Sequence, residues 1–271
     1  MRRSLLLPLA LLGVAGTLLA LRKPSNDRPW KPDYARNPWV EFEGDVALVR
    51  NVRNNRYGAP GTPYDTVWED RSYDLGKVKR LWFAVEPFNP RVKAIAHTFL
   101  SFEFEDNFLA LSVEARTEVG EKFSILEGLI GSFEILYSFG DERDFILRRT
   151  NYLEHEVYLY PLVTKPDEVR AILQRVFEIA NDLVERPQFY NSVMDNCTSS
   201  LKRLANEVRP GSFPPFMLAQ VLPGRTDSVL YRKGWIDTTV PLEALRDVHS
   251  VEQKAGAYAD DPEFSRRIRE G

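Results

Sequence analysis

Hydrophobic and polar side chains alternate along the middle of the chain and then change to a helical spacing. The alternation predicts strands at 46–52, 81–85, 94–104, 109–115, 133–139, 144–148 and 157–162. The separators at 105–107 and 140–143 are short, which favours antiparallel hairpins over crossover connections. Apolar positions then recur every three or four residues and predict helices at 167–185, 197–208 and, for a shorter one, 241–247. The expected fold class is therefore α+β, an antiparallel β-sheet followed by packed helices.

The flanking segments have a different composition. Prolines and two tryptophans at 24–44 predict an extended tether on the surface of the body, and 53–70 is rich in Gly, Pro, Asn and Asp, as long loops are. Residues 211–271 predict an irregular C-terminal extension. We therefore expect residues 24–271 to form a single domain with its core at about 79–210.

The N-terminus has the composition of a membrane segment. Residues 5–21 carry no charge, with Arg2 and Arg3 before them and Arg22 and Lys23 after them. Such a segment is either an uncleaved membrane anchor or a cleaved signal peptide, and poor small-residue spacing at the possible cleavage sites favours the anchor. Either alternative predicts that the remaining body is exported.

Charge and cysteine content exclude several classes of protein. The first 23 residues carry four basic and no acidic side chains, so the other 248 carry 32 basic and 39 acidic side chains. A body this acidic is unsuited to nucleic acid, because phosphate neutralisation needs a basic face. A single cysteine excludes an intramolecular disulfide framework and a cysteine-based zinc site. The sequence motifs of nucleotide-binding proteins, metalloproteases and serine hydrolases do not occur. We therefore predict no cofactor and no metal.

The lone cysteine, Cys197, opens the second predicted helix. Asp195 and Asn196 precede it as N-cap residues, so the sulfur is expected in the first helical turn. Backbone N–H groups and the helix dipole favour thiolate there, and the same N–H groups, with Asn196 and Thr198 nearby, are candidates to hold an oxyanion during acyl transfer. The alternative is that Cys197 is a small buried apolar residue.

His97 lies on a predicted strand and is the candidate base. With a turn at 106–107, Glu114 becomes its diagonal neighbour on the same face, and Ser112 lies on that face as well. The predicted pairs are Ser101 with Ser112, Phe99 with Glu114 and His97 with Arg116. A carboxylate at 114 can orient an imidazole that activates a thiol. The alternative is a histidine bonded to a backbone carbonyl of the sheet.

Other charged groups are expected to be structural. His155 and His249 are predicted on the surface, and Arg148-Arg149 in solvated turns or ion pairs. Arg116 is a further candidate for binding an anionic part of the substrate.

Five ordered segments resemble the Lnb N-terminal periplasmic domain family, a bacterial family named for a lipoprotein N-acyltransferase. The likeness extends from about residue 24 to 270. The segments are His97-Thr98-Phe99-Leu100-Ser101-Phe102, Ser112-Val113-Glu114-Ala115-Arg116, Asp141-Glu142-Arg143-Asp144, Val157-Tyr158-Leu159-Tyr160-Pro161-Leu162, and Tyr190-Asn191 through Asn196-Cys197-Thr198. A histidine on a sheet, followed later by a cysteine that opens a helix, is also similar to circularly permuted papain-like enzymes.

This resemblance implies a location and a chemistry. The location is the bacterial inner membrane, with a single N-terminal anchor and the body facing the periplasm. The chemistry is acyl transfer or amide or ester hydrolysis, with Cys197 as nucleophile, His97 as base and Glu114 or Ser112 as the orienting group. The implied substrates are lipids or lipoproteins ahead of cell-wall peptides. The rival expectation is a non-catalytic binding module of the cell envelope.

Overall fold

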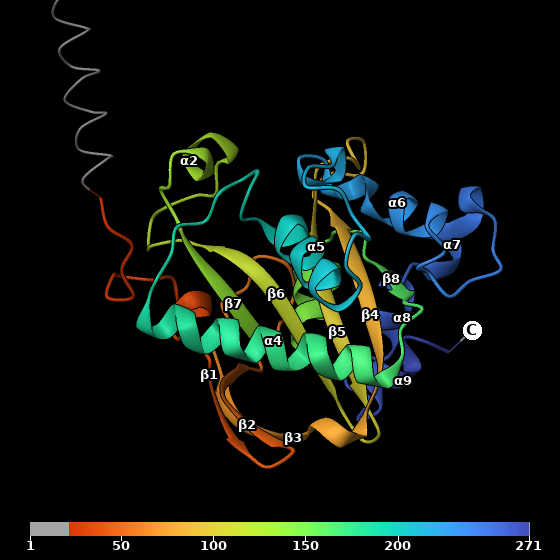
Figure 1. Ribbon diagram of the computed structural model, residues 1–271, viewed down its shortest axis with the longest axis horizontal. Helices are drawn as coiled ribbons and strands as arrows, with labels where there is room; N and C mark the ends of the chain where they lie inside the picture. The colour runs from red at the N-terminus through yellow and green to blue at the C-terminus, as the bar shows by residue number, and fades with distance from the viewer. Residues whose placement is uncertain (1–21, 271) are drawn as a thin grey trace, which may run out of the picture.

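The computed structural model describes residues 22–270, which form one mixed sheet with helices on both faces (Figure 1). The strands are β1 (Trp39–Glu43), β2 (Val46–Arg53), β3 (Trp68–Asp74), β4 (Val78–Pro87), β5 (Ala96–Phe104), β6 (Phe108–Arg116), β7 (Glu134–Gly140) and β8 (Tyr158–Pro161). Their order in the sheet is β1-β2-β7-β6-β5-β4-β8, and β3 pairs with β2 beside this path. The pairs are antiparallel except for a single parallel bridge between β2 and β7. The predicted α+β class is confirmed.

The two longest predicted helices are confirmed in place. The α-helices are α2 (Ile125–Leu129), α3 (Glu142–Leu147), α4 (Pro166–Glu185), α5 (Cys197–Val208), α6 (Thr226–Arg232), α7 (Leu245–His249), α8 (Glu252–Ala257) and α9 (Phe264–Arg267). Shorter turns are η1 (Pro32–Tyr34), η2 (Leu75–Lys77), η4 (Leu218–Gln220), η5 (Pro223–Arg225) and η6 (Leu242–Ala244), and η3 (Arg148–Tyr152) is a π-helical turn. Figure 1 shows α4 lying across one face of the sheet with α5 above it.

The hydrophobic core has two parts, one on each face of the sheet. The larger part lies under α4 and α5 and includes Phe83, Leu100 and Phe177. The smaller part lies on the other face and joins Phe99 of β5 to Phe145 of α3 and to residues of α8 and α9. Because both faces are covered, β5 and β6 are buried along nearly their whole length.

Three expectations about local structure were wrong. Residues 144–148 are not a strand: Asp141 caps a helix by accepting a hydrogen bond from the Arg143 N–H at 2.9 Å, and α3 runs on into η3. Residues 24–44 are not a surface tether, since Trp30 is buried and β1 pairs with β2. The loop after β2 ends at 67, because β3 begins at Trp68 and continues the sheet.

The β5–β6 register also differs from the prediction. Phe99, rather than Ser101, lies opposite Ser112, because Phe104 and Asn107 close the hairpin by a backbone hydrogen bond of 2.9 Å. The difference is two residues, and side chains alternate with period two, so every residue keeps its predicted face. The observed register, continued, brings Glu114 level with His97 instead of diagonal to it.

The predicted membrane segment at 5–21 lies outside the described residues. Between residues 22 and 270, no helix is both long enough and apolar enough to cross a bilayer.

Candidate functional site

Cys197 is the first residue of α5, as the sequence predicts. Asn196 caps the helix: its side-chain oxygen accepts a hydrogen bond of 2.8 Å from the Ser199 N–H, and the Ser199 hydroxyl accepts one of 2.9 Å from the Asn196 N–H. The cap fixes the helix start, and the N–H groups of Cys197 and Thr198 lie in the first turn, where helices have no internal acceptor for them. The thiol is therefore buried at the positive end of a 12-residue helix.

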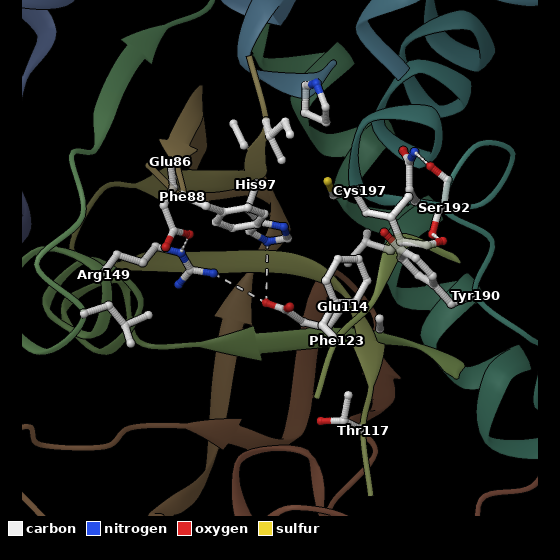
Figure 2. A pocket seen from close by; sticks show the side chains of 18 of the residues that line it. Glu86, Phe88, His97, Glu114, Thr117, Phe123, Arg149, Tyr190, Ser192 and Cys197 are labelled. Carbon is white, nitrogen blue, oxygen red and sulfur yellow. Dashed lines mark hydrogen bonds and ion pairs between the residues drawn. The ribbon is translucent and has the colours of Figure 1, made fainter. Parts of the chain in front are cut away.

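His97 is the second residue of β5, and its ring lies beside this thiol. Its Nε2 lies 2.5 Å from the hydroxyl oxygen of Ser112, and that hydroxyl donates a bond of 2.6 Å to Oε1 of Glu114. Nε2 also lies 3.5 Å from the same carboxylate oxygen. Figure 2 shows His97, Glu114 and Cys197 on the wall of one pocket. The structure thus brings together the four candidate catalytic residues named from the sequence, Cys197, His97, Ser112 and Glu114.

Hydrogen bonding determines which nitrogen of His97 carries the proton. The Ser112 hydroxyl has one hydrogen, and the ionised Glu114 is an acceptor only, so Ser112 gives its hydrogen to Glu114. Ser112 must then accept a hydrogen bond from His97, which places the proton of the neutral ring on Nε2. Nδ1 is left unprotonated and is the nitrogen that can act as a base.

Burial and the charges of their neighbours shift the pKa values of Glu114, His97 and Cys197. Burial by itself raises the pKa of Glu114, but the charges of His97 and Arg149 and the bond from Ser112 outweigh it and lower that pKa to about 2. Burial lowers the pKa of His97, and the charges of Glu114 and Cys197 raise it above its usual value. Burial raises the pKa of the Cys197 thiol, yet the charge of His97 and polar contacts with His97 and Thr98 lower it to about 7. The thiol and the imidazole therefore each favour the charged form of the other.

Arg149 extends this network, and the sequence did not single it out. Its guanidinium is buried and lies 2.6 Å from Glu86 and 3.4 Å from Glu114, and it stacks over Phe99 with its central carbon 4.5 Å from the ring centroid. The carboxylate of Glu86 also accepts a hydrogen bond of 2.8 Å from Nδ1 of His155. One signal in the sequence could have pointed to a buried partner of this kind: Glu86 is a single charge at the end of the apolar run 83–85.

The structure decides between the two alternatives for Arg149 and corrects the expectation for His155. Of the two alternatives expected for Arg149, the ion pair holds and the solvated turn does not, because two carboxylates, on β4 and on β6, neutralise its charge in the interior. His155 is only partly exposed, with a quarter of its side chain accessible, because Glu86 draws its ring inward. His249 is partly buried as well, and its ring lies 5.1 Å from that of Tyr160.

The remaining candidates have other tasks. Asn196 donates its amide hydrogens to the carbonyls of Ser192 and Gln220, each at 2.7 Å, so its side chain is occupied in fixing the helix start. The Thr198 hydroxyl lies 3.2 Å from that of Thr98, which joins α5 to β5.

Arg116 is turned away from the site. It donates to the backbone carbonyls of Tyr34 and Ala35 at 2.8 and 3.2 Å, and its guanidinium carbon lies 4.2 Å from the centroid of the Trp30 ring. The expectation that it binds an anionic substrate group is not met, because the segment 26–35 packs over its strand and uses its donors.

A cavity of about 760 Å³ opens beside the thiol. Cys197, His97 and Glu114 form part of its wall, and Lys31, Asp33 and Arg148 make a second polar region. The rest is largely apolar, with side chains from segments far apart in the sequence. These apolar residues include Phe88, Ile95, Phe123, Ile125, Leu153, Tyr190, Val221 and Leu222. The volume and lining suit a small molecule or a chain of methylene groups. Within the described part of the chain, no group of three or more His, Cys, Asp or Glu side chains could hold a metal ion.

Residues 64–224 match the family model of the Lnb N-terminal periplasmic domain. The match covers more than half of the chain, so the protein belongs to this family, and the family description indicates a periplasmic location. Comparisons with curated proteins and with solved structures gave no match. The similarity to permuted papain-like enzymes therefore stays a prediction.

Proposed function

We propose that this member of the Lnb N-terminal periplasmic domain family is a periplasmic thiol enzyme that transfers acyl groups or hydrolyses an amide or ester. The observation that carries the proposal is the series Cys197, His97, Ser112 and Glu114, of which Cys197, His97 and Glu114 line a large, mostly apolar cavity. The uncharged segment 5–21 holds the chain in the inner membrane.

The reaction has two steps. The Cys197 thiolate attacks the carbonyl carbon and forms a C–S bond, while the negative oxygen is held by the N–H groups of Cys197 and Thr198 in the first turn of α5. The bond to the leaving amine, alcohol or thiol breaks, and the imidazolium of His97 gives that group a proton from Nδ1. In the second step His97 takes a proton from an incoming amine or water, which attacks the acyl carbon and breaks the C–S bond. Thiolate and imidazolium are thereby restored.

The lining of the cavity favours lipid or lipoprotein substrates over cell-wall peptides. Aromatic and aliphatic side chains cover most of the wall beside Cys197, which suits an acyl chain that must leave water. Peptides of the cell wall carry several charged groups, whereas charged side chains of this wall are paired with one another: Arg148 with Asp33, and Arg149 and His155 with Glu86. The acyl donor is therefore expected to be a lipid ester or a thioester.

Alkylation of Cys197 by iodoacetamide tests the proposal. The rate is measured against pH on the full chain in detergent, for the natural protein, for His97→Ala and for His249→Ala as the matched control. We expect a midpoint near 7 for the natural protein and for His249→Ala. In His97→Ala the midpoint should rise toward or above the ordinary thiol value of about 8.5, because only the contacts with Thr98 and the helix start then oppose burial.

A thiol that reacts slowly at every pH, with no dependence on His97, would instead identify a non-catalytic binding module of the envelope. If the coupled pair is found, transfer from lipid thioesters and from cell-wall peptides is compared in the natural protein and in Cys197→Ser. Preference for peptides would replace the lipid substrate by the peptidase alternative.

A further inference from the structure

The mouth of the cavity is surrounded by exposed apolar side chains, which we call the apolar rim. Its members are Phe88, Phe123, Leu126, Ile130, Leu218 and Val221. Leu126 is 74% exposed and Leu218 is 58% exposed. Phe88, Phe123 and Val221 also line the cavity itself, so the rim continues the apolar wall outward. Contiguous apolar surface of this kind marks a binding face.

The rim is a single surface, because hydrogen bonds join the segments that carry it. The Ser192 hydroxyl donates to the Ile125 carbonyl of α2 at 2.9 Å. Asn196, in the same loop as Ser192, donates to the Gln220 carbonyl of η4 at 2.7 Å. The Gly224 N–H of η5 donates at 3.0 Å to the Ala94 carbonyl in the loop between β4 and β5. Four segments are thus tied together around one opening.

The start of the described chain lies next to this surface. The guanidinium of Arg22 lies 4.0 Å from the carboxylate of Glu118 and 5.8 Å from the centroid of the Phe189 ring. Phe189 lies against Gly131, two residues after the end of α2. The uncharged segment 5–21 ends directly before Arg22 in the sequence, so it joins the body beside the rim. Figure 1 shows α2 and the start of the described chain at the end of the molecule opposite the β1–β2 hairpin.

We propose that the apolar rim inserts into the bilayer surface, so that the cavity opens directly onto lipid. The point where the apolar segment 5–21 joins the body selects a bilayer as the occupant, because an anchor there holds the rim against the membrane. Lys122 lies next to Phe123 of the rim in the sequence, and such a basic side chain reaches the polar interface while its apolar neighbour inserts. The acidic body provides little electrostatic attraction to anionic lipid, so apolar insertion supplies the contact. This contact does not depend on the reactivity of Cys197.

Site-specific fluorescence in vesicles tests the contact. The full chain is reconstituted into phosphatidylcholine–phosphatidylglycerol vesicles in a Cys197→Ser background, with an environment-sensitive label on Leu126→Cys. The matched control carries the label on Glu43→Cys, at the exposed end of β1. Both variants share the segment 5–21, so a difference between them reports the placement of the body.

We expect the label at 126 to shift to shorter wavelength and to lose fluorescence when the lipids carry a nitroxide on the acyl chain. The label at 43 should show neither change. The quenching at 126 should persist when salt is raised from about 0.1 M to about 1 M, which shortens the Debye length about threefold. Val221→Cys, on the far side of the rim, provides a second position if Leu126→Cys fails to fold.

Two results would overturn the proposal. Labels at 126 and 221 that stay in water and are not quenched would mean that the rim faces away from the bilayer. A shift without nitroxide quenching that grows with the ratio of protein to lipid would mean that a second copy of the chain covers the rim.

Discussion

The hydroxyl oxygen of Ser112 lies 2.5 Å from Nε2 of His97 and accepts its proton in a hydrogen bond. That hydroxyl gives its own hydrogen to Glu114, so Ser112 links the ring to a carboxylate oxygen that itself lies 3.5 Å from Nε2. The arrangement fixes both the orientation and the tautomer of His97 before any substrate is present. Substitution of Ser112 should therefore change the reactivity of Cys197, as substitution of His97 should.

Ser112→Ala should slow alkylation of Cys197 at pH 7 by roughly tenfold or more. The substitution removes a hydrogen bond to a charged group, which contributes about 1.5–3 kcal/mol, and about 1.4 kcal/mol corresponds to a factor of ten. The control is Ser138→Ala, which alters a buried serine paired with Ser112 across β6 and β7 whose hydroxyl has no partner in the described structure. Equal rates in the two variants would show that Ser112 does not orient His97.

Glu114 should make the free energy of unfolding depend on pH in the acidic range. Folding lowers the pKa of this carboxyl from 4.5 to about 2, so its contribution is complete above pH 4.5 and is lost as the pH falls toward 2. The loss should be about 3 kcal/mol, at 1.36 kcal/mol for each unit. Urea unfolding between pH 6 and pH 2, a range set by these values, should show this slope in the natural protein and in the exposed control Glu185→Gln. Glu114→Gln should have a flatter profile, and an unchanged slope would contradict the assignment.

Arg149→Ala should lower the free energy of unfolding by about 3–5 kcal/mol, because it leaves the buried carboxylates Glu86 and Glu114 without their shared cation. Arg149→Lys keeps the charge but not both contacts, and should lie between the natural protein and Arg149→Ala. Arg175→Ala, at an exposed arginine of α4, should change stability by less than about 1 kcal/mol. Chemical denaturation at pH 7 measures all three. A loss for Arg149→Ala no larger than that for Arg175→Ala would show that the interior does not need this charge.

Gly224→Ala should destabilise the cavity wall. A Cβ at 224 would lie 1.7 Å from the Lys93 carbonyl oxygen, so η5 would have to move away from the loop between β4 and β5. Overpacking of this kind costs about 1–3 kcal/mol. Gly256→Ala in α8 meets nothing closer than 3.9 Å and should be neutral or stabilising by up to about 1 kcal/mol, since alanine is the better helix former. Thermal unfolding should show a lower midpoint temperature for Gly224→Ala than for the natural protein. The midpoint of Gly256→Ala should be equal to or higher than that of the natural protein.

The sequence predicted the features of this chain that depend on residues close together along it. Helices α4 and α5 begin and end within one residue of the ranges predicted from apolar spacing, because a single buried face imposes that spacing along the whole helix. Asn196 before Cys197 predicted the helix start, because a capping side chain acts on backbone groups three residues away. His97, Ser112 and Glu114 were assigned to one face correctly, since alternation on a strand survives a register difference of two.

Features that depend on distant partners were not readable in this way. Arg149 is buried because Glu86, 63 residues earlier, and Glu114 neutralise it. Arg116 looked equally available, yet the segment 26–35 uses its donors. The cavity beside Cys197 is lined by segments that lie between residues 31 and 223 and are far apart in the sequence. Periodicity and capping act between neighbours along the chain, whereas burial of a charge and the shape of a cavity are set by groups that only folding brings together.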